Sequence, residues 1–299
     1  INAKKFSGYG RGVGYSPLSA ENPRESNHAW NAVQVYGYWY LIDVTWDSGH
    51  LDPATMKNVK EYSTAYLFSK PEWFIYDHFP AYSYQQFLDP PVSAEAFTNL
   101  LYLRGKFFDY FILNNNSINK VINISGLTVI NIEKKQNVSI TAQMLTLKGG
   151  NSNYCFTDNN NEYFTLFFAP PQGDYIIRLF SNINSKADFL GELVIKSSIP
   201  AKDSIQAPIL YTTYYSTGAQ LIKPKFQKIT AGMELEISIR IPKSTRAALI
   251  INSKIIAMDY RGDGLFTKTI TVPATREILI SAVLGSGSSY TGIVSLPVY

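Results

Sequence analysis

A histidine and an aspartate stand close together in the stretch SNHAWNAVQVYGYWYLIDVTWDSG, which runs from Ser26 to Gly49. An imidazole held by a carboxylate can activate a nucleophile for attack on an amide carbonyl. The carboxylate fixes the tautomer and stabilises the imidazolium, while the other ring nitrogen takes the proton of the nucleophile. We therefore take His28 as a candidate general base and Asp43 as its orienting acid. The only cysteine, Cys155, lies more than a hundred residues downstream.

A β-hairpin is the element expected to position both side chains, because two β-rich runs flank Gly37. With the turn at Tyr36-Gly37, side-chain alternation puts His28 and Asp43 on one face as diagonal neighbours, ~7 to 8 Å apart, which one hydrogen bond closes. The predicted pairs are Val35 with Tyr38, Val33 with Tyr40, Asn31 with Ile42 and Ala29 with Val44. The face shared with His28 carries Trp30 and Trp39. The opposite face, expected to be the core side, carries Ala29, Val33, Val35, Ile42 and Val44.

The same residues carry a family resemblance. The segment resembles the histidine and aspartate segment of the transglutaminase-like superfamily, specifically its kyphoscoliosis peptidase type, in which a histidine opens an HAWN motif and an aspartate sits in a LIDVTW motif. AYLFSKPEWFIYDHFP (residues 65–80) and QQFLDPPVSAEAF (residues 85–97) are similar to the downstream segment of that type, although Gln85 stands where a tryptophan is expected. The resemblance covers about residues 6 to 105, including the loop-like GYGRGVGY stretch before the histidine.

The resemblance implies a papain-like Cys-His-Asp triad in which His28 is the general base and Asp43 orients it. The implied reaction is acyl transfer on protein amides through a thioester, with water giving proteolysis or deamidation and a lysine amine giving cross-linking. The family places the cysteine on a helix about 40 to 50 residues before the histidine. Here 27 residues precede His28 and none is cysteine.

Three explanations for the missing nucleophile stay open. The first is that the chain is the C-terminal part of a longer polypeptide whose N-terminal segment carries the cysteine and associates with this chain. The second is a pseudoenzyme, a catalytically inactive scaffold or adaptor that binds protein partners through its tandem β-sandwiches. The third is replacement of the nucleophile by Ser7, Ser16 or Cys155, of which a serine lacks the readily formed thiolate.

Composition narrows the classes of partner. The 27 Lys and Arg residues against 23 Asp and Glu residues form no long basic run, which argues against nucleic-acid binding. No apolar run reaches the ~18 residues of a membrane span. The partners expected are protein substrates or protein partners, and no cofactor is implied. A single cysteine allows no internal disulfide, so a cytoplasmic or cytoskeleton-associated location is favoured while the compartment stays open.

The pattern of residues along the chain predicts three domains. Beyond about residue 105 short β-rich runs alternate with Asn, Gly and Pro clusters, as in a β-sandwich. FTLFFAPPQGDYIIRLF from Phe164 and FTKTITVPATREILISA from Phe266 align as a repeat. We therefore expect a multidomain α+β and all-β chain: a partial papain-like, transglutaminase-like core at residues 1–104, lacking its cysteine-bearing part, then immunoglobulin-like β-sandwiches at 105–202 and 203–299.

Several other residues invite a simpler interpretation. The alternating glycines of SGYGRGVGYSP indicate a flexible loop, and Ser93 is a helix N-cap. Cys155 is expected to be a buried structural residue, His78 structural and His50 a surface residue. The wide spacing of the three histidines suggests no metal site.

Overall fold

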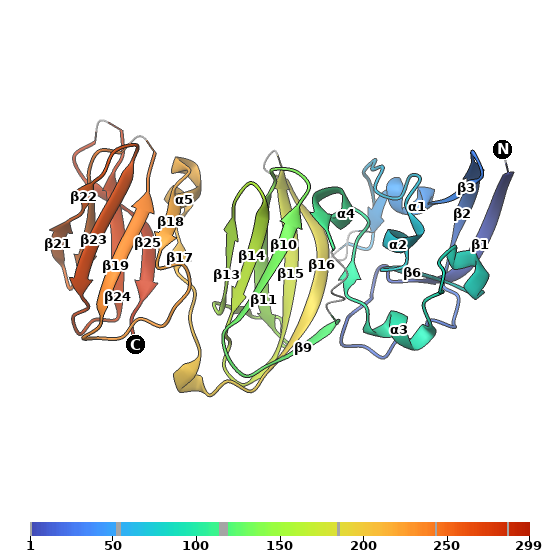
Figure 1. Cartoon of the computed structure of the whole chain (residues 1–299), viewed down its shortest axis with the longest axis horizontal. Coiled ribbons are helices and arrows are strands. Elements are labelled where there is room, and N and C mark those ends of the chain that lie inside the picture. Colours follow the sequence, from blue (N-terminus) through green and yellow to red (C-terminus); the bar gives the residue numbers. More distant parts are fainter. Residues whose placement is uncertain (1, 52–54, 114–118, 184–185, 243, 286) are drawn as a thin grey trace.

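The computed structural model describes residues 2–51, 55–113, 119–183, 186–242, 244–285 and 287–299. Three parts follow one another along the long axis of the chain, and most of their regular structure is β (Figure 1). The N-terminal part combines small sheets with short helices, and each of the other two is built of two packed sheets. Among the described residues, no helix has the length and apolar character that crossing a membrane requires.

The N-terminal part is organised by a four-stranded antiparallel sheet with strand order β3-β2-β1-β6. Between β3 and β6 in the sequence, β4 and β5 form a separate two-stranded antiparallel ribbon. The elements in order are β1 (Asn2–Gly10), β2 (His28–Val35), β3 (Tyr38–Ile42), α1 (Val44–Asp47), β4 (Gly49–Leu51), β5 (Asn58–Lys60), α2 (Pro71–Phe74), β6 (His78–Pro80), a 3-10 turn η1 (Ser83–Gln86) and α3 (Ala94–Asn99). The N-cap predicted for α3 is confirmed, since the Ser93 hydroxyl accepts from the Ala96 amide at 3.1 Å.

The predicted hairpin register is confirmed from Val35 opposite Tyr38 to Asn31 opposite Ile42. Tyr36 and Gly37 both have positive φ, 50° and 84°, as a two-residue hairpin turn of the twisted type requires. The predicted pair of Ala29 with Val44 is wrong, because β3 ends at Ile42 and Val44 begins α1.

The predicted core side of this hairpin is also wrong. The buried side chains are Trp30, Ala32 and Leu41, which lie on the His28 face and are at most 3% exposed. Val44, expected in the core, is 64% exposed. Tyr66 and Phe74 pack on the His28 face together with Phe6 of the neighbouring strand β1, so His28 and Asp43 stand at the edge of a packed aromatic cluster.

The glycine-rich stretch, predicted to be a loop, is a strand up to Gly10 and irregular over residues 11–17. Its first residues, up to Gly10, complete β1, where Gly8 pairs with His28. A Cβ on Gly10 would come within 3.2 Å of the His28 Cβ and 3.3 Å of the Trp46 ring, so a glycine lets β1 pass beneath the histidine. Arg11 follows with its side chain fully buried, held by both oxygens of Glu21 and by the Phe97, Leu100 and Leu101 carbonyls.

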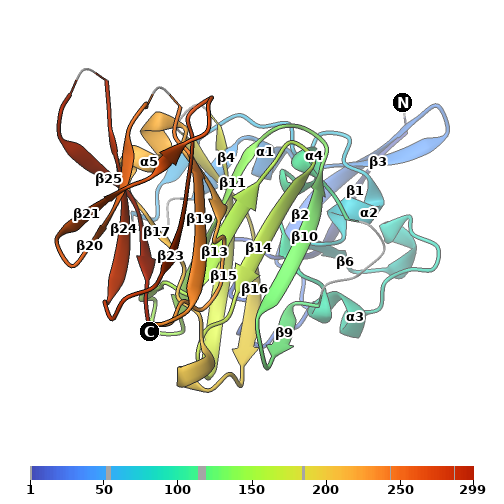
Figure 2. The same ribbon diagram turned by 60° about the vertical axis from the view of Figure 1, so that its left-hand side comes forward.

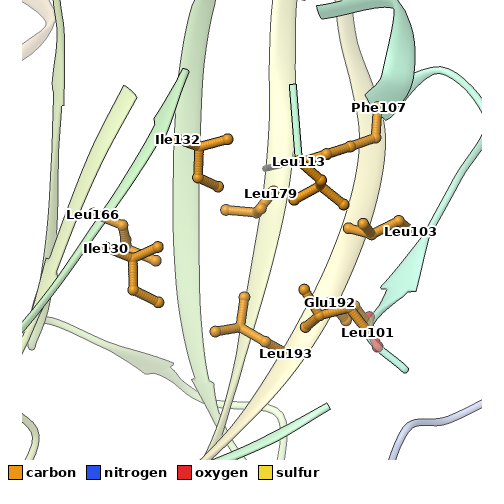
Figure 3. Close-up of a pocket in the computed structure, with 10 residues that line it drawn as sticks. All are labelled: Leu101, Leu103, Phe107, Leu113, Ile130, Ile132, Leu166, Leu179, Glu192 and Leu193. Atoms are coloured by element: carbon orange, nitrogen blue, oxygen red, sulfur yellow. The ribbon is translucent and has the colours of Figure 1, made fainter. Parts of the chain in front are cut away.

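The first sandwich packs a four-stranded sheet, β13-β14-β10-β8, on a sheet of order β12-β11-β15-β16-β7, to which β9 adds in parallel (Figure 2). The apolar side chains between these layers surround a cavity of about 20 Å³, to which Glu192 also contributes (Figure 3). The elements are β7 (Tyr102–Leu103), α4 (Phe107–Tyr110), β8 (Phe111–Ile112), β9 (Val121–Ile124), β10 (Thr128–Lys134), β11 (Ser139–Thr146), β12 (Asn151–Ser152), β13 (Cys155–Asn159), β14 (Tyr163–Phe168), β15 (Gly173–Ile183) and β16 (Lys186–Ser197).

The second sandwich packs β17-β25-β24-β20-β21 on β18-β19-β23-β22. Its elements are a 3-10 turn η2 (Ala201–Asp203), β17 (Ile209–Leu210), α5 (Thr212–Thr217), β18 (Gln220–Lys223), β19 (Glu234–Arg240), β20 (Ala247–Ile251), β21 (Lys254–Ala257), β22 (Asp259–Tyr260), β23 (Leu265–Thr271), β24 (Glu277–Val283) and β25 (Tyr290–Pro297). The predicted repeat is confirmed in the strands, because Phe164 of β14 corresponds to Phe266 of β23. Each strand leads through a proline into a hairpin of the opposite sheet, β15-β16 or β24-β25.

The N-terminal part is joined to the first sandwich through its last strand. β7 pairs with β16 of the sandwich sheet, and the Arg104 amide donates to the Leu190 carbonyl at 2.9 Å. Lys106 pairs with Asp188 at 2.6 Å, and the rings of Trp73 and Phe108 stack with an interplanar angle of 3°. The candidate site therefore lies close to the junction with the sandwich.

Candidate active site

Asp43 is the hub of the candidate site. As N-cap of α1 it accepts from the Thr45 and Trp46 amides through Oδ1, at 2.9 and 3.1 Å. A capping carboxylate is stabilised by such amides and by the helix dipole. Its other oxygen, Oδ2, remains for side chains, and the carboxylate is only 1% exposed. The end of β3 and the start of α1 thus fix this group before any histidine contacts it.

His28 makes the hydrogen bond that the hairpin predicted. Its Nε2 lies 2.6 Å from Asp43 Oδ2, and the ring stacks on Trp46 with centroids 5.3 Å apart. Because an ionised Asp43 only accepts, the proton of a neutral His28 sits on Nε2. Nδ1 has no hydrogen-bond partner among the described residues, and 16% of the side chain is exposed. This nitrogen is therefore available to take a proton.

His78 also contacts Asp43, which the sequence interpretation of a merely structural residue did not anticipate. Its Nε2 lies 3.0 Å from Asp43 Oδ2, and its Nδ1 lies 2.6 Å from Asp77 Oδ1. The ring is fully buried between Trp46 and Phe74, with centroids 4.2 and 3.9 Å away. Strand β6 brings it there by pairing with β1, directly beside the β1-β2 pair.

The hydrogen-bonded chain continues inward from His78. The Tyr66 hydroxyl donates to Asp77 Oδ2 at 2.5 Å and accepts from the Gly105 amide at 2.9 Å. Tyr66 is 3% exposed, and burial raises its pKa well above the ordinary value. The phenol therefore keeps its proton and acts as a fixed donor, which anchors Asp77 to the strand entering the sandwich.

The charges of this chain are set by mutual contact. Burial by itself raises the pKa of the Asp43 carboxyl, but the hydrogen bonds from His28 and His78 outweigh it and hold that pKa well below its usual range. Burial likewise opposes charge on His78, but Asp77 and Asp43 together raise its pKa above the ordinary 6.5. The two aspartates thus favour the imidazolium form of His78, and the two histidines favour the ionised form of Asp43.

The same three groups form the metal-ligand geometry that the histidine spacing did not suggest. One ligand atom from each of His28, Asp43 and His78 lies within 4.8 Å of the others. In the hydrogen-bonded arrangement, however, both Nε2 atoms direct protons at Asp43 Oδ2, and a metal would require both to leave. We therefore treat the cluster as a hydrogen-bonded relay.

None of the three nucleophiles considered within the chain meets His28 Nδ1 in the described structure. Ser7 pairs with Ala29, so it points to the sheet face opposite Gly8 and His28. The Ser16 hydroxyl accepts from the Leu18 amide at 3.3 Å in a turn. Cys155 lies in β13 of the first sandwich, where burial raises the pKa of its thiol to about 12. Its expected structural role agrees with this setting.

A cleft of about 690 Å³ opens beside Trp46. The β4-β5 ribbon, the first residues of α1 and Arg104 line it. His50, expected at the surface, is exposed there and its Nδ1 lies 3.2 Å from Glu61. Trp46 lines the cleft and stacks on His28, so one indole connects the wall of the cleft with the imidazole.

Comparison with known proteins finds several relatives that are similar to part of the chain. The chain is 32% identical over 180 residues to "Kyphoscoliosis peptidase" of Mus musculus and 31% identical over 186 residues to that of Homo sapiens. The matches cover 60% and 62% of this chain, and the chain spans about a quarter of these relatives, 27% and 28% of their length. It is also 29% identical over 114 residues to "Lim and transglutaminase domain protein ltd-1" of Caenorhabditis elegans, covering 35% of this chain and 16% of that protein. No family model matches the chain.

Solved structures add only remote likenesses. Titin Ig tandem domains A164-A165 and titin domains Z1Z2 in complex with telethonin each cover 60% of this chain and 90% and 91% of their own. The identities are 11% and 12% and both TM-scores are 0.18, a level that carries no argument.

Proposed function

We propose that this chain, whose sequence similarity supports a transglutaminase-like assignment of the kyphoscoliosis peptidase type, provides the histidine and aspartate of a thiol acyl-transfer centre acting on protein amides. His28 is the general base and Asp43 its orienting acid. The nucleophile is a cysteine outside these 299 residues, on a segment that associates with this chain. The observation that carries the proposal is the 2.6 Å contact of His28 Nε2 with Asp43 Oδ2, which leaves Nδ1 unoccupied among the described residues.

The proposed reaction has two halves. The thiol gives its proton to His28 Nδ1 while its sulfur forms a bond to the amide carbon. The carbon–nitrogen bond then breaks, and the departing amine takes the proton from the imidazolium. Water or a lysine amine next attacks the thioester, giving its own proton to Nδ1, and the thiol leaves with that proton. The acceptor decides between hydrolysis and cross-linking.

The finer architecture belongs to the same proposal. Residues 1–104 form part of a papain-like core, and residues 105–202 and 203–299 form two immunoglobulin-like domains. Supporting this division, each C-terminal part has two packed sheets of its own. The boundary at 104 is a working one, because Tyr102–Leu103 already pairs with the first sandwich.

Alkylation of the cysteine tests the proposal without knowledge of the substrate. In a polypeptide that joins this chain to the cysteine-bearing segment, iodoacetamide should label that cysteine rapidly, since an imidazolium neighbour lowers the thiol pKa. His28→Ala should slow labelling at neutral pH by about tenfold or more. His50→Ala, at an exposed histidine, is the matched control. Equal labelling rates in wild type and His28→Ala would remove His28 from the role of base.

A second candidate function rests on a different observation. The described residues place neither a thiol nor a hydroxyl at His28 Nδ1. This arrangement would also suit an inactive protein that keeps the fold and binds protein partners through its two sandwiches. In that case the relay is structural, and no cysteine of the longer polypeptide would respond to His28. The labelling experiment therefore separates the two functions.

A further inference from the structure

The cleft beside Trp46 carries an arginine whose hydrogen-bonding capacity is largely unused. Arg104 Nη1 donates to the Tyr102 hydroxyl at a long 3.4 Å. Among the described residues, this is the only hydrogen bond that the Arg104 guanidinium makes. No described carboxylate forms an ion pair with the guanidinium. A guanidinium has five N–H donors in a planar fork that matches a carboxylate. Most of those donors are therefore free for a ligand.

Arg104 is held rigidly in spite of its few polar partners. Its guanidinium carbon lies 4.0 Å from the centroid of the Trp46 ring and 5.6 Å from that of Tyr66. Stacking on aromatic faces orients the plane of an arginine and lowers the entropy lost when it binds a ligand. The backbone is fixed as well, through the bond of its amide to the Leu190 carbonyl.

The charges around the cleft favour an anion. Lys60, also on the lining, is exposed on β5. Glu61, the acidic residue among the described lining residues, lies against His50 at 3.2 Å. A carboxylate entering the cleft thus meets the guanidinium of Arg104 and the exposed ammonium of Lys60 on the same lining, although the buried Asp77 also acts on the Arg104 charge.

We propose that Arg104 is a substrate-recognition residue that binds a carboxylate close to the amide on which the site acts. The inference rests on the proposed function for the identity of that amide. Arg104 and His28 both contact the indole of Trp46, so one side chain separates them. At about 3.3 Å per residue of extended chain, the carboxylate belongs about two or three residues from the target amide. The substrate class is therefore acidic protein segments, or segments that end in a free carboxylate.

Peptide binding to the chain as it stands tests the inference, with no need for a nucleophile. The probes are three short alanine-based peptides with a central glutamine. The first peptide carries a glutamate near the central glutamine and has an amidated C-terminus. The second has glutamine in place of that glutamate and is also amidated. The third has the sequence of the second but a free C-terminal carboxylate. NMR titration of the Trp46 indole and Arg104 Nε–H resonances gives each Kd. We expect the glutamate peptide to bind about tenfold or more tightly than the amide peptide.

The third peptide distinguishes a side-chain carboxylate from a C-terminal one. If it binds tightly, Arg104 recognises the free C-terminus of a peptide. Equal Kd values for all three peptides would overturn the proposal, and this comparison uses only the wild-type protein. Arg104→Gln should abolish the preference, while Arg276→Gln, at an exposed arginine of the second sandwich, should keep it. A preference that survives in Arg104→Gln would also overturn the proposal. His28→Ala should retain the preference, so a failure of the thiol chemistry is distinguishable from a failure of this recognition.

Discussion

Asp43→Asn is expected to lower acyl transfer on the order of 10⁴-fold while the chain remains folded. The carboxamide no longer enforces a proton on His28 Nε2 and does not stabilise an imidazolium. Asparagine is nevertheless a good N-cap, so α1 keeps its first turn. The measurement is acylation of the cysteine by p-nitrophenyl acetate in a polypeptide that includes the cysteine-bearing segment, with circular dichroism as the folding check.

The matched control for this change is Asp174→Asn, at an exposed aspartate of β15. It should acylate at the wild-type rate. Unaltered acylation in Asp43→Asn would take Asp43 out of the mechanism. A loss of activity together with a loss of fold would be resolved by His28→Gln, which leaves the capping bonds of Asp43 in place.

His78→Leu should destabilise the protein by about 3 to 5 kcal/mol, because it leaves Asp43 and Asp77 buried without the cation that lies between them. A raised folded pKa means that the His78 contribution is fully present below its ordinary pKa of 6.5 and is lost as the pH rises through the folded value. The difference in unfolding free energy between wild type and variant should therefore narrow as the pH rises above 6.5 and through the folded pKa of His78. Urea unfolding over a pH series measures it.

His50→Leu, at a histidine whose side chain is 53% exposed, is the control and should change the free energy of unfolding little.

The contribution of Asp43 to the free energy of unfolding depends on pH with the opposite sign. Its lowered pKa makes its contribution present above the ordinary 3.8 and lost as the pH falls through the folded value. A wild-type stability curve with the same slope above pH 6.5 as the His78→Leu curve would contradict the raised pKa of His78.

The hairpin was predictable because its register depends on local chemistry. Tyr36 and Gly37 set the turn, and the pairs up to Asn31 and Ile42 follow from it. The core side was not predictable, because both faces are apolar and the choice depends on which face the segment with Tyr66 and Phe74 packs on. Strand β1, NAKKFSGYG, begins with polar residues and ends in the glycine-rich stretch, so it has no hydrophobic alternation from which the sequence could predict it.

His78 was missed for a related reason. It lies 35 residues from Asp43 in the chain, and only the pairing of β6 with β1 makes the contact. A signal was nevertheless present, since an adjacent aspartate and histidine within the short run YDHFP form an ionisable pair that could have been weighed with His28. Long-range strand pairing has no local signature of that kind, and Arg104 was likewise not foreseen.

The proton of His28 provides the most direct test of the central claim. Long-range ¹H–¹⁵N NMR of the neutral ring reports which nitrogen is protonated. The account predicts a proton on Nε2, donated to Asp43, and a free acceptor at Nδ1. A proton on Nδ1, or an Nε2 resonance that does not respond to Asp43→Asn, would contradict it.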